Sequence, residues 1–219
     1  VDIVLTRNED GRGARFNPEV ALEGQTPSLS GTAQYDESEG TIVVDGVVKG
    51  IRPDRLARQF AALAPLRGLT LPVNAEFEIR STVDGVLRGG RYRLSAGTGA
   101  LEIPDLLPRA VPVRSATARG SFDVEPPRIV LDEVKLDLGG PTIGLSAIVA
   151  RTNGAVTVDG ETVVKNLPLA DLKSYWPKNV NPVLHEWITN NMEGGEITEA
   201  RASMRVQTTP SGEWSFEKS

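Results

Sequence analysis

Residues 167–195, LPLADLKSYWPKNVNPVLHEWITNNMEGG, contain two of the three tryptophans and the only histidine of the chain. Two runs of apolar residues at helical spacing lie in this segment. Each run begins with a proline, which is favoured at the first position of a helix. Pro177 ends the first run and Gly194 ends the second. We therefore predict two short helices, at 168–176 and at 182–193.

A third helix is predicted at 52–66, where Leu56 and Phe60 begin an apolar stripe at helical spacing. A stripe of this kind must pack on something, and the simplest candidate is a sheet. Trp176 and Trp187 are expected to be structural and to fix the later helices on that sheet, because tryptophan brings a large apolar area to a small helix.

Most of the remaining chain has the period of two that is typical of strands. Residues 75–80, AEFEIR, place Phe77 and Ile79 on one face and charged residues on the other. Similar segments recur with turn signals between them. Strand patterns do not alternate with helix patterns along the chain, so a parallel sheet is not expected. We expect roughly ten to twelve strands in a mostly β protein with a long antiparallel sheet.

Several segments are expected to interrupt the strands. Residues 1–30 look irregular apart from a strand at 1–6, and 104–112 form a proline-rich loop. Asp45-Gly46 lies inside the β-branched run TIVVDGVVK and suggests a bulge. Residues after 153 are expected to form two pieces, AVTVDG and ETVVKNL, and the chain should end in a hairpin beyond residue 196.

The composition excludes several classes of protein. The chain has 219 residues, no cysteine and a net charge of −5, with acidic and basic residues mixed along it. No basic block suggests nucleic acid, and no run approaches the roughly 20 apolar residues of a membrane-spanning helix. The chain begins without Met and with a strand pattern, so we expect a single unit, residues 1–219, cut from a longer protein.

No constellation of residues indicates catalysis or a bound cofactor. His185 stands alone beside Glu186, without the second histidine of a zinc-protease helix and without a Gly-x-Ser-x-Gly turn. Asp132 and Glu133 are adjacent in a strand, where neighbouring side chains point to opposite faces. We therefore expect a protein that is not an enzyme, with no metal and no cofactor.

Alternation gives the sheet one apolar face, which three helices are too few to cover. Such a face must close on itself, meet a second sheet or hold something apolar. A β-sandwich whose inner faces take up these residues explains the alternation equally well. The strand residues that would line an apolar groove are Ile42, Val44, Val48, Phe77, Ile79, Leu94, Phe122, Ile129, Leu131, Leu136, Leu138, Ile143, Leu145, Val156, Val158, Met204 and Val206.

Three motifs in residues 167–201 carry a family resemblance. They are LPLADLKSYWP at 167–177, HEWITNN at 185–191 and GGEITEAR at 194–201. They resemble the AsmA-like family of bacterial envelope lipid-transfer proteins, in particular its large YhdP/TamB-type members. Weaker likeness lies in LRGLTLPV at 66–73 and GTGALEIP at 97–104.

The resemblance implies a sheet curled into an open hydrophobic groove, like a β-taco, with the helices packed on it. It also implies a segment of a lipid conduit that moves phospholipid between the inner and outer membranes. The expected location is the periplasm of a Gram-negative bacterium. The expected partners are phospholipid and neighbouring segments of the same parent chain, which would carry an inner-membrane anchor. The rival expectation is a structural or adhesive β module that binds a protein by strand addition, without lipid.

Overall fold

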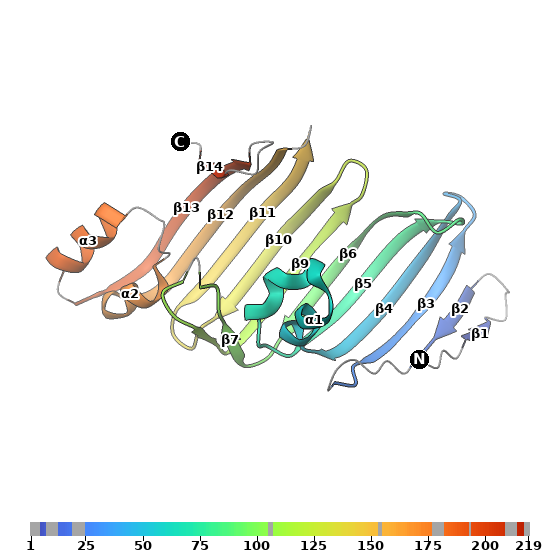
Figure 1. The fold of residues 1–219 in the computed structure, drawn as a ribbon, viewed down its shortest axis with the longest axis horizontal. Coiled ribbons are helices and arrows are strands. Elements are labelled where there is room, and N and C mark those ends of the chain that lie inside the picture. Colours follow the sequence, from blue (N-terminus) through green and yellow to red (C-terminus); the bar gives the residue numbers. More distant parts are fainter. Residues whose placement is uncertain are drawn as a thin grey trace.

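One large antiparallel sheet makes up most of the protein (Figure 1). In the described residues it has twelve strands in the order β1-β2-β3-β4-β5-β6-β9-β10-β11-β12-β13-β14, and β7 pairs with β8 in a separate ribbon. Because β1 and β14 lie at opposite ends of that order, the sheet is open. The computed structural model describes residues 5–7, 13–18, 25–104, 107–152, 155–176, 182–192, 194–208 and 214–216.

The strands follow one another along the chain as neighbours in the sheet, except where the β7–β8 ribbon separates β6 from β9. This order confirms the expected mostly β, antiparallel fold. The strands are β1 (Leu5–Arg7), β2 (Gly13–Phe16), β3 (Ser28–Asp36), β4 (Thr41–Ile51), β5 (Val73–Thr82), β6 (Leu87–Ala96), β7 (Gly99–Leu101), β8 (Val111–Val113), β9 (Ser115–Asp123), β10 (Arg128–Asp137), β11 (Thr142–Thr152), β12 (Ala155–Pro168), β13 (Glu196–Thr208) and β14 (Trp214–Phe216).

Some strand predictions were wrong. The stretch before residue 30 is not irregular, because it holds β2 and the start of β3. Val111 and Pro112, expected in the loop at 104–112, belong to β8, which pairs with β7. The two pieces expected after residue 153 are one strand of 14 residues, β12, which pairs along its length with β11 and β13. The predicted last hairpin is confirmed by the pairing of β13 with β14.

The bulge predicted at Asp45-Gly46 was also wrong. Both residues pair in regular register with β3 and with β5. The irregular step of β4 lies further on, between Val48 and Ile51, where Gly50 has a φ of 75°. An Asp-Gly pair thus sits inside a regular strand, and its glycine has a packing role described below.

Two hairpin turns show why the neighbouring strands reverse where they do. Gly85 between β5 and β6 and Gly139 between β10 and β11 both have φ of 87°, which glycine adopts without steric cost. Asp137 stabilises the second turn, since its Oδ1 accepts a hydrogen bond of 2.8 Å from the backbone N–H of Gly139. Asp84-Gly85 therefore lies in the turn between β5 and β6.

The helices lie in the connections between strands. They are α1 (Pro53–Gln59), η1 (Ala61–Gly68), η2 (Leu169–Asp171), α2 (Leu172–Tyr175) and α3 (Pro182–Asn191). The single helix predicted at 52–66 was wrong, because the chain breaks at Phe60, which is extended with φ −117° and ψ 111°. The following turns are of the 3-10 type. Pro65 lies among them, lacks a backbone N–H and disfavours the α conformation before it.

The predicted helices at 168–176 and 182–193 are present in shortened form. The first is a 3-10 turn leading into α2, and the second is α3. The rings of Trp176 and His185 lie 5.3 Å apart and link α2 to α3. Trp187 does not fix its helix on the sheet as expected, because it points outward and is 58% exposed. Pro177, expected to end the first of these helices, lies outside the described residues.

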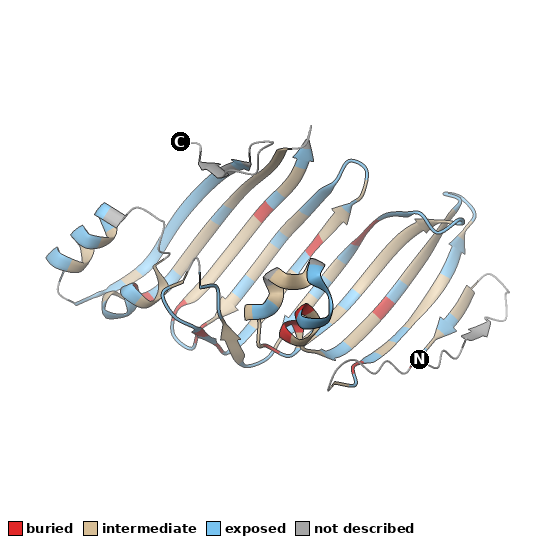
Figure 2. Cartoon of the chain, viewed as in Figure 1, coloured by how far each residue is buried: buried red, intermediate tan, exposed pale blue. Residues whose placement is uncertain are grey.

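The buried core sits at one end of the middle strands β6, β9, β10 and β11 and does not extend over the whole sheet. Leu71, Val111, Val113 and Leu138 form a buried cluster at this end. Half-buried residues packed against it come from strands, from the 99–107 connection and from α2: Ala96, Leu101, Leu107, Ala116, Leu136, Ile143 and Tyr175. Elsewhere most strand residues are only half-buried or exposed (Figure 2).

Candidate functional site

The register of the sheet separates its residues into an apolar face and a polar face. Residues paired across strands point to the same side. One row of the apolar face crosses the sheet as Val44, Ile79, Gly90, Phe122, Ile129, Val149, Val158 and Val206. One row of the polar face crosses it as Asp45, Glu78, Arg91, Ser121, Val130, Ile148, Asp159 and Arg205.

The residues predicted to line a groove belong to the apolar face, with Leu138 just beyond the end of β10, except that the side chain of Val206 lies outside the described part of the structure. Three of them lie at the end where the core cluster covers this face. Leu138 is buried in the cluster, and Leu136 and Ile143 pack against it. These three are occupied by the protein's own packing. The other predicted residues stand on the middle and far end of the face.

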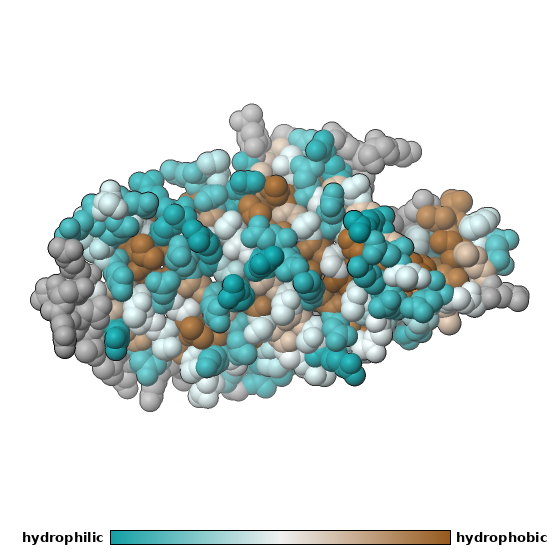
Figure 3. All heavy atoms as spheres, turned by 180° about the vertical axis from the view of Figure 1, so that it is seen from behind, coloured by the Kyte–Doolittle hydropathy of each residue, from teal (hydrophilic) through white to brown (hydrophobic). Residues whose placement is uncertain are grey.

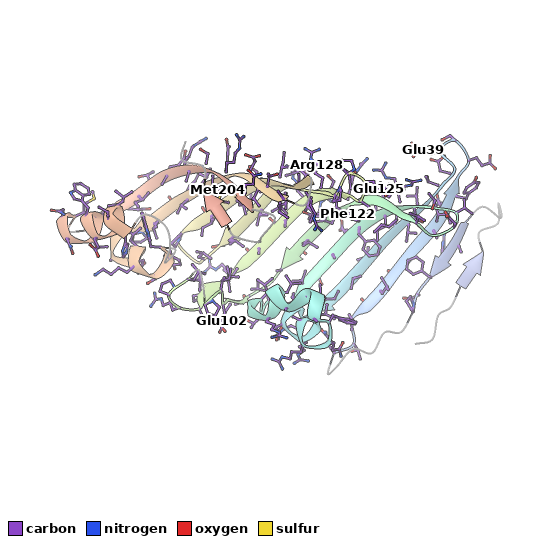
Figure 4. The ribbon with its side chains drawn as sticks, turned by 45° about the horizontal axis from the view of Figure 1, so that its top comes forward. Glu39, Glu102, Phe122, Glu125, Arg128 and Met204 are labelled. Carbon is purple, nitrogen blue, oxygen red and sulfur yellow. The ribbon has the colours of Figure 1, made fainter. Side chains whose placement is uncertain are left out.

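The far end of the apolar face has exposed apolar side chains. Ile129 on β10 is 46% exposed and Met204 on β13 is 43% exposed. Phe122 on β9 stands in the same row as Ile129, and Figure 4 labels it together with Met204. The segments α1, η1, β7 and β8 lie in front of the lower ends of the middle strands in the view of Figure 1 and leave the upper part of this face open.

Four aromatic rings on the apolar face lie across glycines of the adjacent strand. A Cβ at Gly46 would be 2.7 Å from Cε2 of Phe77, and one at Gly90 would be 2.9 Å from Cε1 of Phe122. The other pairs are Phe16 with Gly31 and Tyr92 with Gly120. Sequence reasoning identified Phe77 and Phe122 but missed the glycines, because nothing local tells an in-strand glycine facing a ring from one in a turn.

The opposite face carries the charges (Figure 3). Arg93 pairs with Glu76 at 3.4 Å between β6 and β5, and Arg205 pairs with Asp159 at 2.5 Å between β13 and β12. Glu199 on β13 accepts from Arg201 at 2.7 Å and from Lys165 at 3.1 Å. The hydrogen bond from Arg201 is the largest cause of a lowered pKa at Glu199, and the hydrogen bond from Lys165 is the next largest.

Glu133 on the polar face is held in a similar way. The Lys135 ammonium donates to its carboxylate at 2.5 Å, and Arg119 approaches it at 3.3 Å. The hydrogen bond from Lys135 is the main reason why the pKa of Glu133 is lowered. Exposed ion pairs of this kind, within one strand or between strands, contribute little each, but they keep one face of a large sheet in water.

Two depressions of about 650 and 630 Å³ lie on the polar face. The first is flanked by Asp159, Glu161 and Arg205, and the second by residues that include Glu78 and Arg93. The first depression also includes apolar and small residues, such as Val130, Ile148 and Ser203. From the apolar face each depression takes in residues of one row only, such as Leu131 and Ala147 in the first and Phe77 and Tyr92 in the second.

The described residues hold no group of three or more histidine, cysteine or acidic side chains placed to bind a metal ion. His185 packs against Trp176 instead. Within the same residues, no helix combines the length and the apolar character needed to cross a bilayer. Comparison with protein-family models, with curated proteins and with solved structures found no match.

Proposed function

We propose that the apolar face binds the acyl chains of phospholipid and that the chain is one segment of a periplasmic lipid conduit between the inner and outer membranes. The observation that carries this proposal is the apolar row that runs from Val44 through Phe122 to Val158 without a charged residue. No second layer of the described residues covers the far part of this row.

The chemistry of the face suits an acyl chain better than a polar ligand. Each buried methylene contributes about 0.8 kcal/mol, so a chain lying over several strands would be held without any specific polar contact. Binding that depends only on continuity of apolar surface also allows a lipid to slide from one strand to the next. The residues assigned to this lining are the predicted ones without Leu136, Leu138 and Ile143.

Neighbouring segments of the parent protein would extend the lining, and the parent would carry the inner-membrane anchor. The family resemblance of residues 167–201 supports this part of the proposal. The polar face would then stand in the aqueous periplasm, where its ion pairs keep it soluble.

A matched pair of variants tests the proposal. Met204 and Ser203 are adjacent and exposed on β13 but point to opposite faces. Met204→Lys should reduce binding of a fluorescent phospholipid, because it places a charge among the acyl chains, whereas Ser203→Lys should leave binding unchanged. Equal binding by both variants would contradict an apolar-face site.

The rival function is strand addition, and the open edge of β13 favours it. In the described residues β14 pairs with β13 only at Val206–Thr208, so the edge from Glu196 onward has no strand beside it. A protein partner could add a strand there. Charged residues such as Glu199 and Arg201 along this strand are the kind that discourage such pairing. A protein that stays free of lipid and captures an extended peptide along β13 would support the rival.

A further inference from the structure

The outer edge of β13 has a long stretch with no strand beside it. In the described residues β14 covers only Val206–Thr208, and Glu196–Arg205 has β12 on its other side alone. Exposure reflects this. Ala147 on the inner strand β11 is buried, whereas Ala200 and Ala202, alanines on the same apolar face, are exposed. The backbone groups on the outer side of this stretch are therefore available to a further strand.

The charges along this stretch are complementary to themselves. Glu199 and Arg201 lie on the polar face, on either side of Ala200. In an antiparallel pair of identical strands, residues at equal distances from the two-fold axis stand opposite each other. An axis at Ala200 therefore places Glu199 of each copy opposite Arg201 of the other. Opposite charges directly across a strand pair stabilise it, and like charges destabilise it.

Arg201 has no carboxylate opposite it in the strand that it already pairs with. It stands opposite Val163 of β12, its side chain is 74% exposed, and it pairs at 2.7 Å with Glu199 of its own strand. On the inner strand β6, by contrast, Arg93 pairs with Glu76 of the neighbouring strand. A second copy would give Arg201 a cross-strand carboxylate of the same kind.

The position of this axis also suits the length of the open stretch. The strand begins at Glu196 and β14 covers it from Val206, so Ala200 lies near the middle of the open part. Ile197–Ser203 can then pair with the same residues of a second copy without displacing β14. Because residues paired across strands share a face, the apolar faces of the two copies would lie on the same side.

The helix α3 adds exposed apolar side chains at this edge. It lies beyond β13, at the same end of the sheet, in both ribbon views (Figures 1 and 4). Val183 and Trp187, one turn apart on α3, are 76% and 58% exposed. A second copy docked along β13 would lie next to this helix.

We propose that the chain forms a two-fold dimer in which Ile197–Ser203 of β13 pairs antiparallel with the same stretch of a second copy, with the axis at Ala200. The inference goes beyond lipid binding and does not depend on it, since the edge of β13 and the apolar face are different surfaces. Glu199 and Arg201 disfavour strands without a complementary pattern, and they select the second copy, which has one.

Sedimentation equilibrium of the full chain tests the dimer. We expect the wild type to dimerise as its concentration rises. Arg201→Glu and Glu199→Arg should each weaken the dimer about tenfold, because each change places like charges opposite each other. An equal mixture of these variants should restore dimerisation, since the acids of one chain then face the bases of the other. Arg93→Glu on β6, where the side chain is 70% exposed, is the control and should dimerise like the wild type.

A wild-type chain that stays monomeric would overturn the proposal, as would a dimer that both charge reversals leave intact. A mixture that associates no more tightly than the separate variants would also overturn it. Hydrogen exchange provides a second measurement if a variant does not fold. Protection of backbone amides within Ile197–Ser203 of the wild type should rise with protein concentration, and unchanged protection would contradict the dimer. Both measurements are made without lipid, so a negative result leaves the proposed lipid binding untouched.

Discussion

The hydroxyl of Tyr92 on β6 reaches across β9 and donates a hydrogen bond of 3.1 Å to the backbone carbonyl of Val130 on β10. The ring passes over Gly120, where a Cβ would lie 2.6 Å from the hydroxyl oxygen. The register of β10 shifts just beyond this carbonyl, between Leu131 and Glu133. A single side chain thus ties three neighbouring strands together at an irregular step.

Removal of this hydroxyl should destabilise the fold. Tyr92→Phe removes the hydrogen bond to the Val130 carbonyl, and the loss of one such bond costs about 0.5–1.5 kcal/mol. The free energy of unfolding in urea measures the loss. Tyr35→Phe is the control, because Tyr35 is 44% exposed and its change should stay within about 0.5 kcal/mol. Equal stability of the two variants would show that the hydrogen bond contributes nothing.

Gly46→Ala should also lower stability, by about 1–3 kcal/mol, because the added methyl group overpacks against the Phe77 ring. Gly144→Ala has room for the methyl group and should change stability by less than about 0.5 kcal/mol. Urea unfolding of both variants tests this difference. A neutral Gly46→Ala would mean that the ring moves away without resistance.

Burial of one leucine in α2 should contribute measurably to the stability of the protein. Leu172 in α2 is 2% exposed, and truncation of a buried leucine costs about 2–5 kcal/mol. Leu172→Ala should therefore lower the unfolding free energy by that amount. Val183→Ala on α3, where the side chain is 76% exposed, should have little effect. A small loss from Leu172→Ala would show that α2 is only loosely packed.

The ion pairs of the polar face predict a loss of stability in acid. The pKa values of Glu133 and Glu199 are lowered in the folded chain, so their contribution is present above the ordinary pKa of glutamate, about 4.3. It is lost as the pH falls through the lowered values. Unfolding midpoints between pH 6 and 3 should fall less steeply for Glu133→Gln/Glu199→Gln than for the wild type. An identical slope would contradict the assigned shifts.

The alternation of apolar and polar residues was enough to predict the sheet and its two faces. Phe77 and Ile79 on one side and Glu76 and Glu78 on the other lie as the period of two requires. This period is a local property of a strand, so the sequence alone displays it. The apolar residues of this pattern also gave the candidate lining, because pairing in register places them on the same side of the sheet in every strand.

What the sequence did not reveal depends on contacts between distant residues. Asp45-Gly46 and Asp159-Gly160 look like turns, yet both lie in regular strands. There the aspartate faces water, and the glycine faces Phe77 in one case and Met204 in the other. Likewise, Leu138 is buried with Val111 and Val113 of β8, a strand of three residues that is too short to show a periodic pattern in the sequence.

Phospholipid retained by the purified chain is the most direct measurement. Native mass spectrometry, followed by lipid extraction, should find phospholipid bound to the wild-type protein and much less bound to Met204→Lys. A folded wild-type chain, with its unfolding transition intact, that carries no phospholipid and takes none up from vesicles would contradict the assignment of the apolar face to lipid.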